Sequence, residues 1–304
     1  TSLGCHTDLW EPYQNGPSRL SLDRHWAPRF GELRYAGDAL GQITEHWAEQ
    51  TGLTRECRVL CGLHDSNAAL LAARGHPVVG RHDATVLSTG TWFVAMRSPS
   101  QQLAWQRPPA LNERRDCLVN VDVSGWPTPS ARFMGGREAE LIAGHDPLDF
   151  AGVADPDTLI ERLPMLMQAG VFVLPSFVAG VGPFPDLVGR WINEPDDQSD
   201  RRAVLGLYLA LMADAALELI GSREMLIVEG RFAEDPVFVR ALATLRPEQR
   251  VFVSNARDEV SYGALRLINP HLAPPAPLVK VEPLAFLLEP YRAHWRETLE
   301  GALA

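Results

Sequence analysis

Residues 58–96 hold two compact elements that constrain how this chain can fold. The first is a short apolar run at residues 59–63 followed by an Ala- and Leu-rich segment at residues 67–74, a pattern that predicts a strand and then a helix. Asp65 falls between them, at the carboxyl end of the strand. Ligands of α/β sheets gather at such ends, and a carboxylate there can accept the proton of a substrate hydroxyl. The alternative is that Asp65 or Ser66 only caps the helix.

The second element is a predicted β-hairpin. Residues 84–87 and 92–96 are rich in β-prone side chains, and the four residues between them are small and mostly hydroxylated: Ser88, Thr89, Gly90 and Thr91. Such a turn exposes backbone N–H groups and two Thr hydroxyls, which suit phosphate oxygens. Tight hairpins also need small residues for structural reasons alone, so the turn by itself leaves both interpretations open.

Together, HDSNAALLA around Asp65 and LSTGTW around Thr89 resemble the FGGY family of carbohydrate kinases, most closely its rhamnulokinase and fuculokinase-like branch. The initial TSLGCHTDLW is similar to family sequence as well. The resemblance implies an α/β protein with the actin-like ATPase (ribonuclease H-like) fold. Residues 1–76 would be the carboxyl-terminal part of a first, sugar-binding domain, and residues 77–304 a complete second, nucleotide-binding domain.

The resemblance also implies an activity, the transfer of the ATP γ-phosphate to a sugar hydroxyl with Mg²⁺ as the accompanying ion. The family's catalytic base corresponds to Asp65, and His64 beside it is expected to face the sugar. The turn formed by residues 88–91 would face the nucleotide phosphates. Sugar, ATP and Mg²⁺ are therefore the expected small-molecule partners.

One part of the chain departs from the family pattern. The strand matching residues 226–228 ends, in the family, in a triple-Gly-like turn close to adenine and ribose, whereas this chain has Glu229, Gly230 and Arg231. Glu229 can bond ribose hydroxyls, and Arg231 can stack on adenine or reach a phosphate. Their bulk can equally exclude the usual nucleotide pose, which would leave a catalytically impaired sugar-binding or regulatory protein.

Two further residues are candidate sugar contacts. The ring of Trp10 could stack on a sugar face, and His6 could hydrogen-bond sugar hydroxyls. Both residue types also commonly pack a domain, so this structural interpretation stays open. Residues 1–30 have no sustained period and are expected to be irregular.

Composition narrows the class of partner. The formal net charge of −10 argues against a nucleic-acid-binding surface, because phosphate backbones are bound by clustered Lys and Arg.

No segment has the pattern of a signal peptide, and no apolar run is long enough to cross a bilayer. Both observations favour a cytoplasmic protein without membrane contact. The four cysteines, at positions 5, 57, 61 and 117, lack metal-site spacing and are expected to be reduced and buried. A homodimer remains open.

The rest of the chain continues as alternating elements. We expect Arg201 and Arg202 to lie in an exposed first turn of an amphipathic helix. The predicted elements are a helix at 39–51, a strand at 118–123, a helix at 130–143, a strand at 171–174, a Gly- and Pro-rich loop at 179–189, a helix at 200–220, a strand at 224–228, a helix at 235–245, a strand at 250–254, and helices at 261–268 and 283–302. Three strands followed by helix, strand, helix, strand, helix are typical of an actin-like domain.

The beginning of the chain adds one expectation. It starts at Thr1 without an initiator Met, and the family's opening Asp-x-Gly-Thr loop is missing. We therefore expect this chain to be the carboxyl-terminal portion of a longer sugar kinase.

Overall fold

A computed structural model describes residues 3–5, 7–100, 105–148, 154–255 and 259–303. Its strands are β1 (Trp10–Glu11), β2 (Gly16–Pro17), β3 (Ala39–Gln42), β4 (Arg58–Leu60), β5 (Ala84–Thr89), β6 (Phe93–Ser98), β7 (Cys117–Val121), β8 (Pro127–Phe133), β9 (Phe172–Leu174), β10 (Arg190–Ile192), β11 (Met225–Gly230), β12 (Arg250–Val253) and β13 (Val279–Lys280). Its helices are α1 (Arg19–Asp23), α2 (Glu45–Thr51), α3 (Asp65–Ala73), α4 (Gly135–Ala143), α5 (Pro156–Gln168), α6 (Gln198–Leu219), α7 (Pro236–Leu245), α8 (Glu259–Ile268) and α9 (Glu289–Leu303), with short 3-10 turns at Ala27–Arg29, Glu113–Arg115 and Arg231–Glu234.

A seven-stranded mixed sheet forms the centre of the molecule, in the order β13-β12-β11-β5-β6-β8-β7. Strands β5, β11 and β12 are parallel, while β6, β8 and β7 extend the sheet from β5 by antiparallel pairing. The antiparallel strands β5, β6 and β8 next to the parallel strands β11 and β12 are the arrangement expected of an actin-like domain. The predicted fold class is therefore confirmed.

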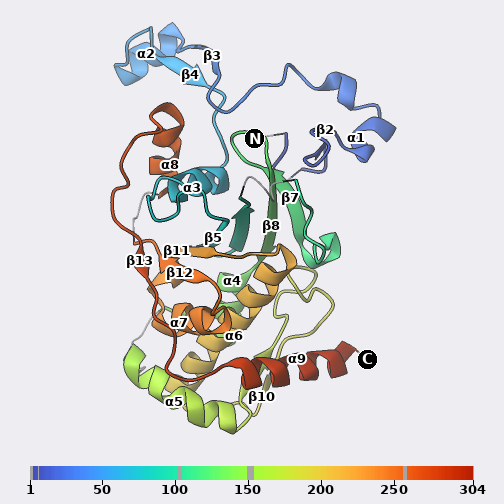
Figure 1. Cartoon of the computed structure of the whole chain (residues 1–304), viewed down its shortest axis with the longest axis vertical. Helices are drawn as coiled ribbons and strands as arrows, with labels where there is room; N and C mark the ends of the chain where they lie inside the picture. The colour runs from blue at the N-terminus through green and yellow to red at the C-terminus, as the bar shows by residue number, and fades with distance from the viewer. Residues whose placement is uncertain (1–2, 6, 101–104, 149–153, 256–258, 304) are drawn as a thin grey trace.

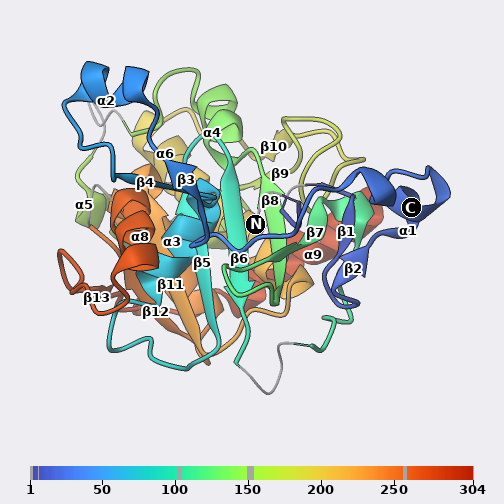
Figure 2. The ribbon, with the colours of Figure 1, turned by 90° about the horizontal axis from the view of Figure 1, so that it is seen from above.

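Alternation along the central strands sends side chains to two different cores. Ile227 of β11 and Val86 of β5 pack with α3, whereas Val228 and Leu87, one residue further along each strand, pack with α6 and its neighbours. Helices α3 and α8 consequently lie on one side of the sheet and α4, α6 and α7 on the other (Figure 1). Figure 2 gives the same arrangement from above, with α3 and α8 lying across the sheet near β5 and β11.

The prediction of a helix over residues 130–143 is wrong in its first part. Residues up to Phe133 belong to strand β8, and helix α4 begins at Gly135. Pro127 and Pro129 argue against a central strand, because proline cannot donate a ladder hydrogen bond. In the structure, β8 pairs with β6 only from Ser130 to Phe133, and both prolines lie beyond that pairing, where β7 is the remaining neighbour. The strand thus tolerates both prolines, and the helix begins only at Gly135.

Strand β9 forms within the predicted range of residues 171–174 and pairs with β10 in a small separate sheet. The prediction for residues 39–51 is wrong in part. The predicted helix at 39–51 is instead strand β3 followed by α2, because Thr44 caps α2 by accepting a hydrogen bond from the Trp47 N–H. The short elements β1, β2 and α1 also occupy the segment that was expected to be irregular.

Helix α6 lies within the core rather than along the surface. It is buried on nearly every face between the sheet, α5 and α7, so it is not amphipathic. Arg201 is exposed as expected, but Arg202 is only 4% exposed and forms a 2.8 Å ion pair with Asp235, so the expectation of an exposed position is wrong for Arg202. None of the helices in the described ranges has the length and apolar character needed to span a membrane.

Candidate active site

Helix α3 carries Asp65 to one particular end of the sheet. Leu70 of α3 packs against the start of β5, and Arg74, just after the helix, donates a 2.6 Å hydrogen bond to the His82 carbonyl, which precedes β5. The carboxyl end of α3 therefore lies near the start of β5, and its amino end is directed toward the end of β5. Asp65 and the Ser88–Thr91 turn consequently share one end of the sheet.

The Asp65 side chain is exposed, and its Oδ1 accepts a 2.6 Å hydrogen bond from the Ser66 N–H. The N-cap residue of α3 is His64, which is half-buried and makes no side-chain capping bond. Asp65 is thus the first helical residue rather than the N-cap. An exposed carboxylate at the positive end of a helix can accept a proton from a bound hydroxyl.

The predicted hairpin forms, and β11 completes its turn. Glu229 lies beside Ser88 in the parallel register, and the Ser88 hydroxyl donates a 2.5 Å hydrogen bond to Glu229 Oε1. The Thr89 hydroxyl donates to the Glu229 carbonyl at 2.5 Å and accepts from the Phe232 N–H at 3.1 Å. Thr89 is buried at 2% exposure, so its hydroxyl ties the two strands together, and Thr91 carries the exposed threonine hydroxyl of this turn.

Three backbone segments meet at the turn so closely that two of them require glycine. A β-carbon on Gly230, whose φ is +85°, would lie 2.3 Å from the Thr89 carbonyl oxygen. A β-carbon on Gly136 at the start of α4 would lie 2.2 Å from the Gly90 carbonyl oxygen. The amino end of α4 is therefore against the turn, and the N–H groups of a helix start favour anions.

Gly135 and Gly136 were not predicted as residues of the site. Their signal was present, since a Gly-Gly pair immediately before an apolar helical period marks a close backbone approach. The predicted helix, however, began five residues earlier and placed both glycines inside it. The turn, α4 and Gly230 together form what we call the cradle, defined as residues 88–91, Gly135, Gly136 and Gly230.

Glu229 is an acid at the edge of this cradle. Its pKa is raised, chiefly because burial disfavours the charged form; the hydrogen bond from Ser88 opposes this, and the charges of Glu259 and Asp65 add to the rise. The Asp65 charge is therefore close enough to the turn to affect the pKa of Glu229. Within the described ranges, no three His, Cys, Asp or Glu side chains converge as metal ligands.

Arg231 is engaged away from the turn. Its guanidinium forms an ion pair with Asp146, with 2.9 Å to each carboxylate oxygen, and both side chains are more than half exposed. Asp146 follows α4, so the pair connects the segment after β11 with the far end of α4. No local pattern around Arg231 or Asp146 predicts this pair.

Trp10 lies away from the cradle. Trp10 is half-buried and lines a pocket with Tyr35 and Asp122, at the turn between β7 and β8. None of Asp65, the turn at 88–91 or Glu229 lines that pocket. His6, the other candidate sugar contact, lies outside the described residues.

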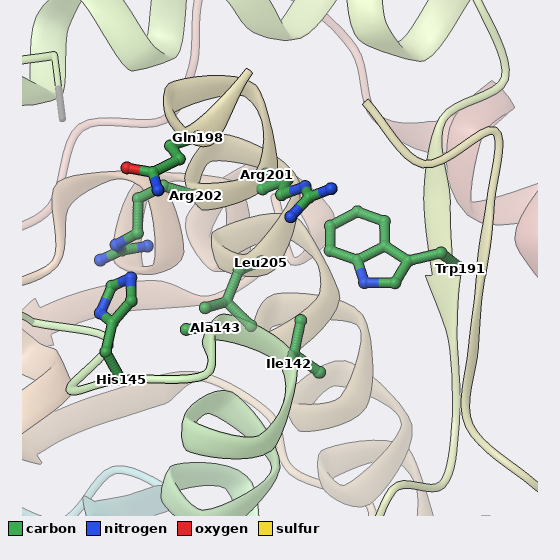
Figure 3. A pocket seen from close by; sticks show the side chains of 8 residues that line it. All are labelled: Ile142, Ala143, His145, Trp191, Gln198, Arg201, Arg202 and Leu205. Atoms are coloured by element: carbon green, nitrogen blue, oxygen red, sulfur yellow. The ribbon is translucent and has the colours of Figure 1, made fainter. Parts of the chain in front are cut away.

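A second pocket lies between the end of α4 and the start of α6. Figure 3 shows His145 beside Arg202 in this pocket and Arg201 close to the ring of Trp191. Arg201 also pairs with Glu194 at 3.2 Å. None of the residues predicted for catalysis or ligand binding lines it.

The central sheet, with a glycine-lined polar turn at the end of β5, places the chain in the class of actin-like ATPase folds. Residues 81–275 match the family model described as the carbohydrate kinase FGGY, C-terminal domain. This match covers well over half of the chain, so the chain belongs to the FGGY family of carbohydrate kinases.

Solved structures agree. The chain is 49% identical, with a TM-score of 0.89, to a carbohydrate kinase from Novosphingobium aromaticivorans, covering 100% of this chain and 64% of that one. A xylulose kinase from Rhodospirillum rubrum is 18% identical with a TM-score of 0.63, over 89% of this chain and 56% of that one. A gluconate kinase from Lactobacillus acidophilus is 9% identical with a TM-score of 0.71, over 97% and 61%. The search of curated proteins found no match.

Proposed function

We propose that the complete protein transfers the γ-phosphoryl group of ATP to a hydroxyl group of a ketose, deoxyketose or polyol. The observation that carries this proposal is the position of Asp65, an exposed acid at the same end of the sheet as the glycine-lined cradle. One group can remove a proton there and the other can hold phosphates. The chain spans 64% of the kinase that it resembles at 49% identity, so the activity concerns the complete gene product.

In this proposal Asp65 accepts the proton of the sugar hydroxyl as the sugar oxygen forms a bond to the γ-phosphorus. The bond from that phosphorus to the bridging β–γ oxygen breaks, and ADP leaves with the electron pair. Backbone N–H groups of the turn and the amino end of α4 would hold the phosphates, because oriented N–H groups stabilise the charge without reorganising. The exposed Thr91 hydroxyl would add a donor. The residues of the cradle would therefore act mainly through position.

Mg²⁺ fits the residues present. In kinases it is usually held by one or two carboxylates together with phosphate oxygens and water, rather than by a full set of protein ligands. Glu229 is a carboxylate at the cradle and would be its protein ligand, directly or through water, which leaves Asp65 free to accept the proton. When bound, the ion neutralises phosphate charge. His64 beside Asp65 remains our candidate for a sugar contact, and Trp10 for a more distant one.

The turn at residues 229–231, which differs from the family pattern, has other roles in this proposal than those expected from the sequence. Glu229 is bonded to Ser88, so we assign it to the phosphate end of the nucleotide rather than to ribose. Gly230 admits the nucleotide backbone closely, and Arg231 would contact adenine only after leaving Asp146.

We place the protein in the cytoplasm, where ATP is supplied. Sedimentation of the complete gene product would show whether it is a homodimer.

A second candidate is a sugar-binding or regulatory protein with impaired catalysis. It is favoured by the two side chains, Glu229 and Arg231, that occupy the turn where the family carries glycine. The two candidates differ in turnover. The complete gene product should be assayed with ATP and Mg²⁺ over a panel of ketoses, deoxyketoses and polyols, and titrated with each sugar and with ATP by calorimetry. ADP release with one sugar class supports the kinase, whereas sugar binding without ADP release supports the regulatory protein.

A further inference from the structure

Glu138 is a buried acid that the proposed chemistry does not use. It lies in the first turn of α4, is 1% exposed, and all its partners in the described residues donate to it. Its Oε1 accepts hydrogen bonds from the N–H groups of Phe177 at 3.1 Å and Val178 at 3.2 Å. Its Oε2 accepts one from the Tyr208 hydroxyl of α6. A buried carboxylate is costly unless it is fully hydrogen-bonded, so this arrangement is specific to an acceptor.

The position of Glu138 connects it to the cradle. It follows Gly136 by two residues, and Gly136 is the residue whose backbone lies against the Gly90 carbonyl. A shift of the first turn of α4 would therefore move Gly136 relative to the turn at 88–91.

The segment that Glu138 holds also lies against the start of α4. Phe177 and Val178 begin the loop between β9 and β10, in which a β-carbon on Gly182 would lie 2.8 Å from the Phe133 side chain. Phe133 ends β8 and directly precedes the glycines of α4. Glu138 thus fixes this loop, α4 and α6 at one point.

We propose that Glu138 is a positioning residue for the phosphate-binding cradle, holding the amino end of α4 and the Phe177–Val178 segment in the one arrangement that keeps Gly136 against Gly90. The expected effect of Glu138 on nucleotide binding rests on the proposed function. Its expected effect on the position of the backbone rests on the structure alone. An apolar residue of similar size would leave two part-buried N–H groups without their acceptor, which costs free energy and favours movement of the loop. The carboxylate prevents that movement.

The test uses three variants of the complete gene product. Glu138→Leu removes the acceptor, Glu138→Gln keeps one carbonyl oxygen for both N–H groups, and Tyr208→Phe removes only the hydroxyl. Calorimetry with ADP should give an affinity about tenfold weaker for Glu138→Leu, since hydrogen bonds to charged groups have about this effect, and one within about threefold of wild type for Glu138→Gln. Sugar affinity should not change.

A matched control separates positioning from stability. Asp214 is a second buried carboxylate, farther along α6, and it pairs with Arg246 at 2.7 Å rather than with the cradle. Asp214→Asn should lower Tm while leaving ADP affinity unchanged. Glu138→Leu with a lowered Tm but wild-type ADP affinity would overturn the proposal, because Glu138 would then only stabilise the core.

If the wild-type protein binds no nucleotide, the proposed function is refuted but the positioning role of Glu138 is not. Hydrogen exchange then tests that role. In the nucleotide-free protein, Glu138→Leu should speed exchange in peptides covering residues 175–189 and also in those covering residues 88–91. Faster exchange in the first region only would overturn the proposal. If the Leu variant fails to fold, Glu138→Met provides the same comparison, because it also removes the acceptor of both N–H groups, with faster exchange in both regions expected.

Discussion

The Glu229 carboxylate accepts a 2.5 Å hydrogen bond from the Ser88 hydroxyl, so β11 contributes an acid to the polar turn of the β5–β6 hairpin. Burial and the charges of Glu259 and Asp65 raise its pKa. The charge of Asp65 thus adds to the rise in the pKa of Glu229 at this end of the sheet. Perturbed pKa values of this kind are common at functional sites.

The raised pKa of Glu229 gives a stability prediction. The folded state binds this proton more tightly than the unfolded state, whose value is near 4.5, so the stabilising contribution is present below pH 4.5 and is lost as the pH rises through the raised pKa. Glu229→Gln removes this titration. Relative to the variant, wild type should therefore lose free energy of unfolding as pH rises above 4.5. Urea unfolding at several pH values measures it, with the exposed Glu248→Gln as control. A difference between wild type and Glu229→Gln that stays constant with pH would contradict the prediction.

Asp65→Asn tests the general base. Since a positioned base contributes roughly 10²–10⁴ in rate, kcat of the complete gene product should fall by about that factor, with little change in ATP affinity. Asp157→Asn is the matched control, because Asp157 is also an exposed aspartate in the first turn of a helix, α5, on another part of the molecule. Turnover with the preferred sugar is the measurement. An Asp65→Asn enzyme with wild-type kcat would end the assignment.

Gly136→Ala tests the cradle. The added β-carbon would lie 2.2 Å from the Gly90 carbonyl oxygen, so α4 or the turn must move, and overpacking of this kind costs about 1–3 kcal/mol. ATP affinity should fall, and so should the free energy of unfolding. Gly31→Ala is the control, because a β-carbon there meets nothing within 4 Å. Calorimetric titration with ATP reports the first effect, and equal affinity in both variants would mean that the phosphates lie elsewhere.

Local patterns predicted the strands that are buried on both faces. Strands β5 and β11 were found because their apolar residues are continuous, as expected of such strands. The hairpin turn followed from its four small residues. The position of Asp65 at the start of a helix followed from its place between an apolar run and an Ala- and Leu-rich segment, whereas its role as a base follows only from the family resemblance and stays a prediction.

The misses depend on partners distant in the chain. Nothing near Arg202 indicates that Asp235 lies 2.8 Å away, so an arginine in a first turn was expected in solvent. Strand β8 was missed because its two prolines weigh against a strand. They fit here because they lie where β8 has only β7 as a neighbour, which its own residues do not reveal. The role of Gly136 likewise depends on Gly90, which is 46 residues away along the chain.

The packing of α3 on α8 gives the last prediction. A β-carbon on Gly263 of α8 would lie 1.8 Å from the Ala68 carbonyl oxygen of α3, so Gly263→Ala must separate the two helices. The free energy of unfolding should fall by about 1–3 kcal/mol or more. Turnover should fall as well, because α3 carries Asp65. Gly301→Ala in the exposed face of α9 meets nothing within 4 Å and should instead be neutral or stabilising by up to about 1 kcal/mol, because alanine has the higher helix propensity. Urea unfolding of both variants measures the contrast, and a Gly263→Ala protein as stable as the Gly301→Ala protein would show that α3 and α8 are not in this contact.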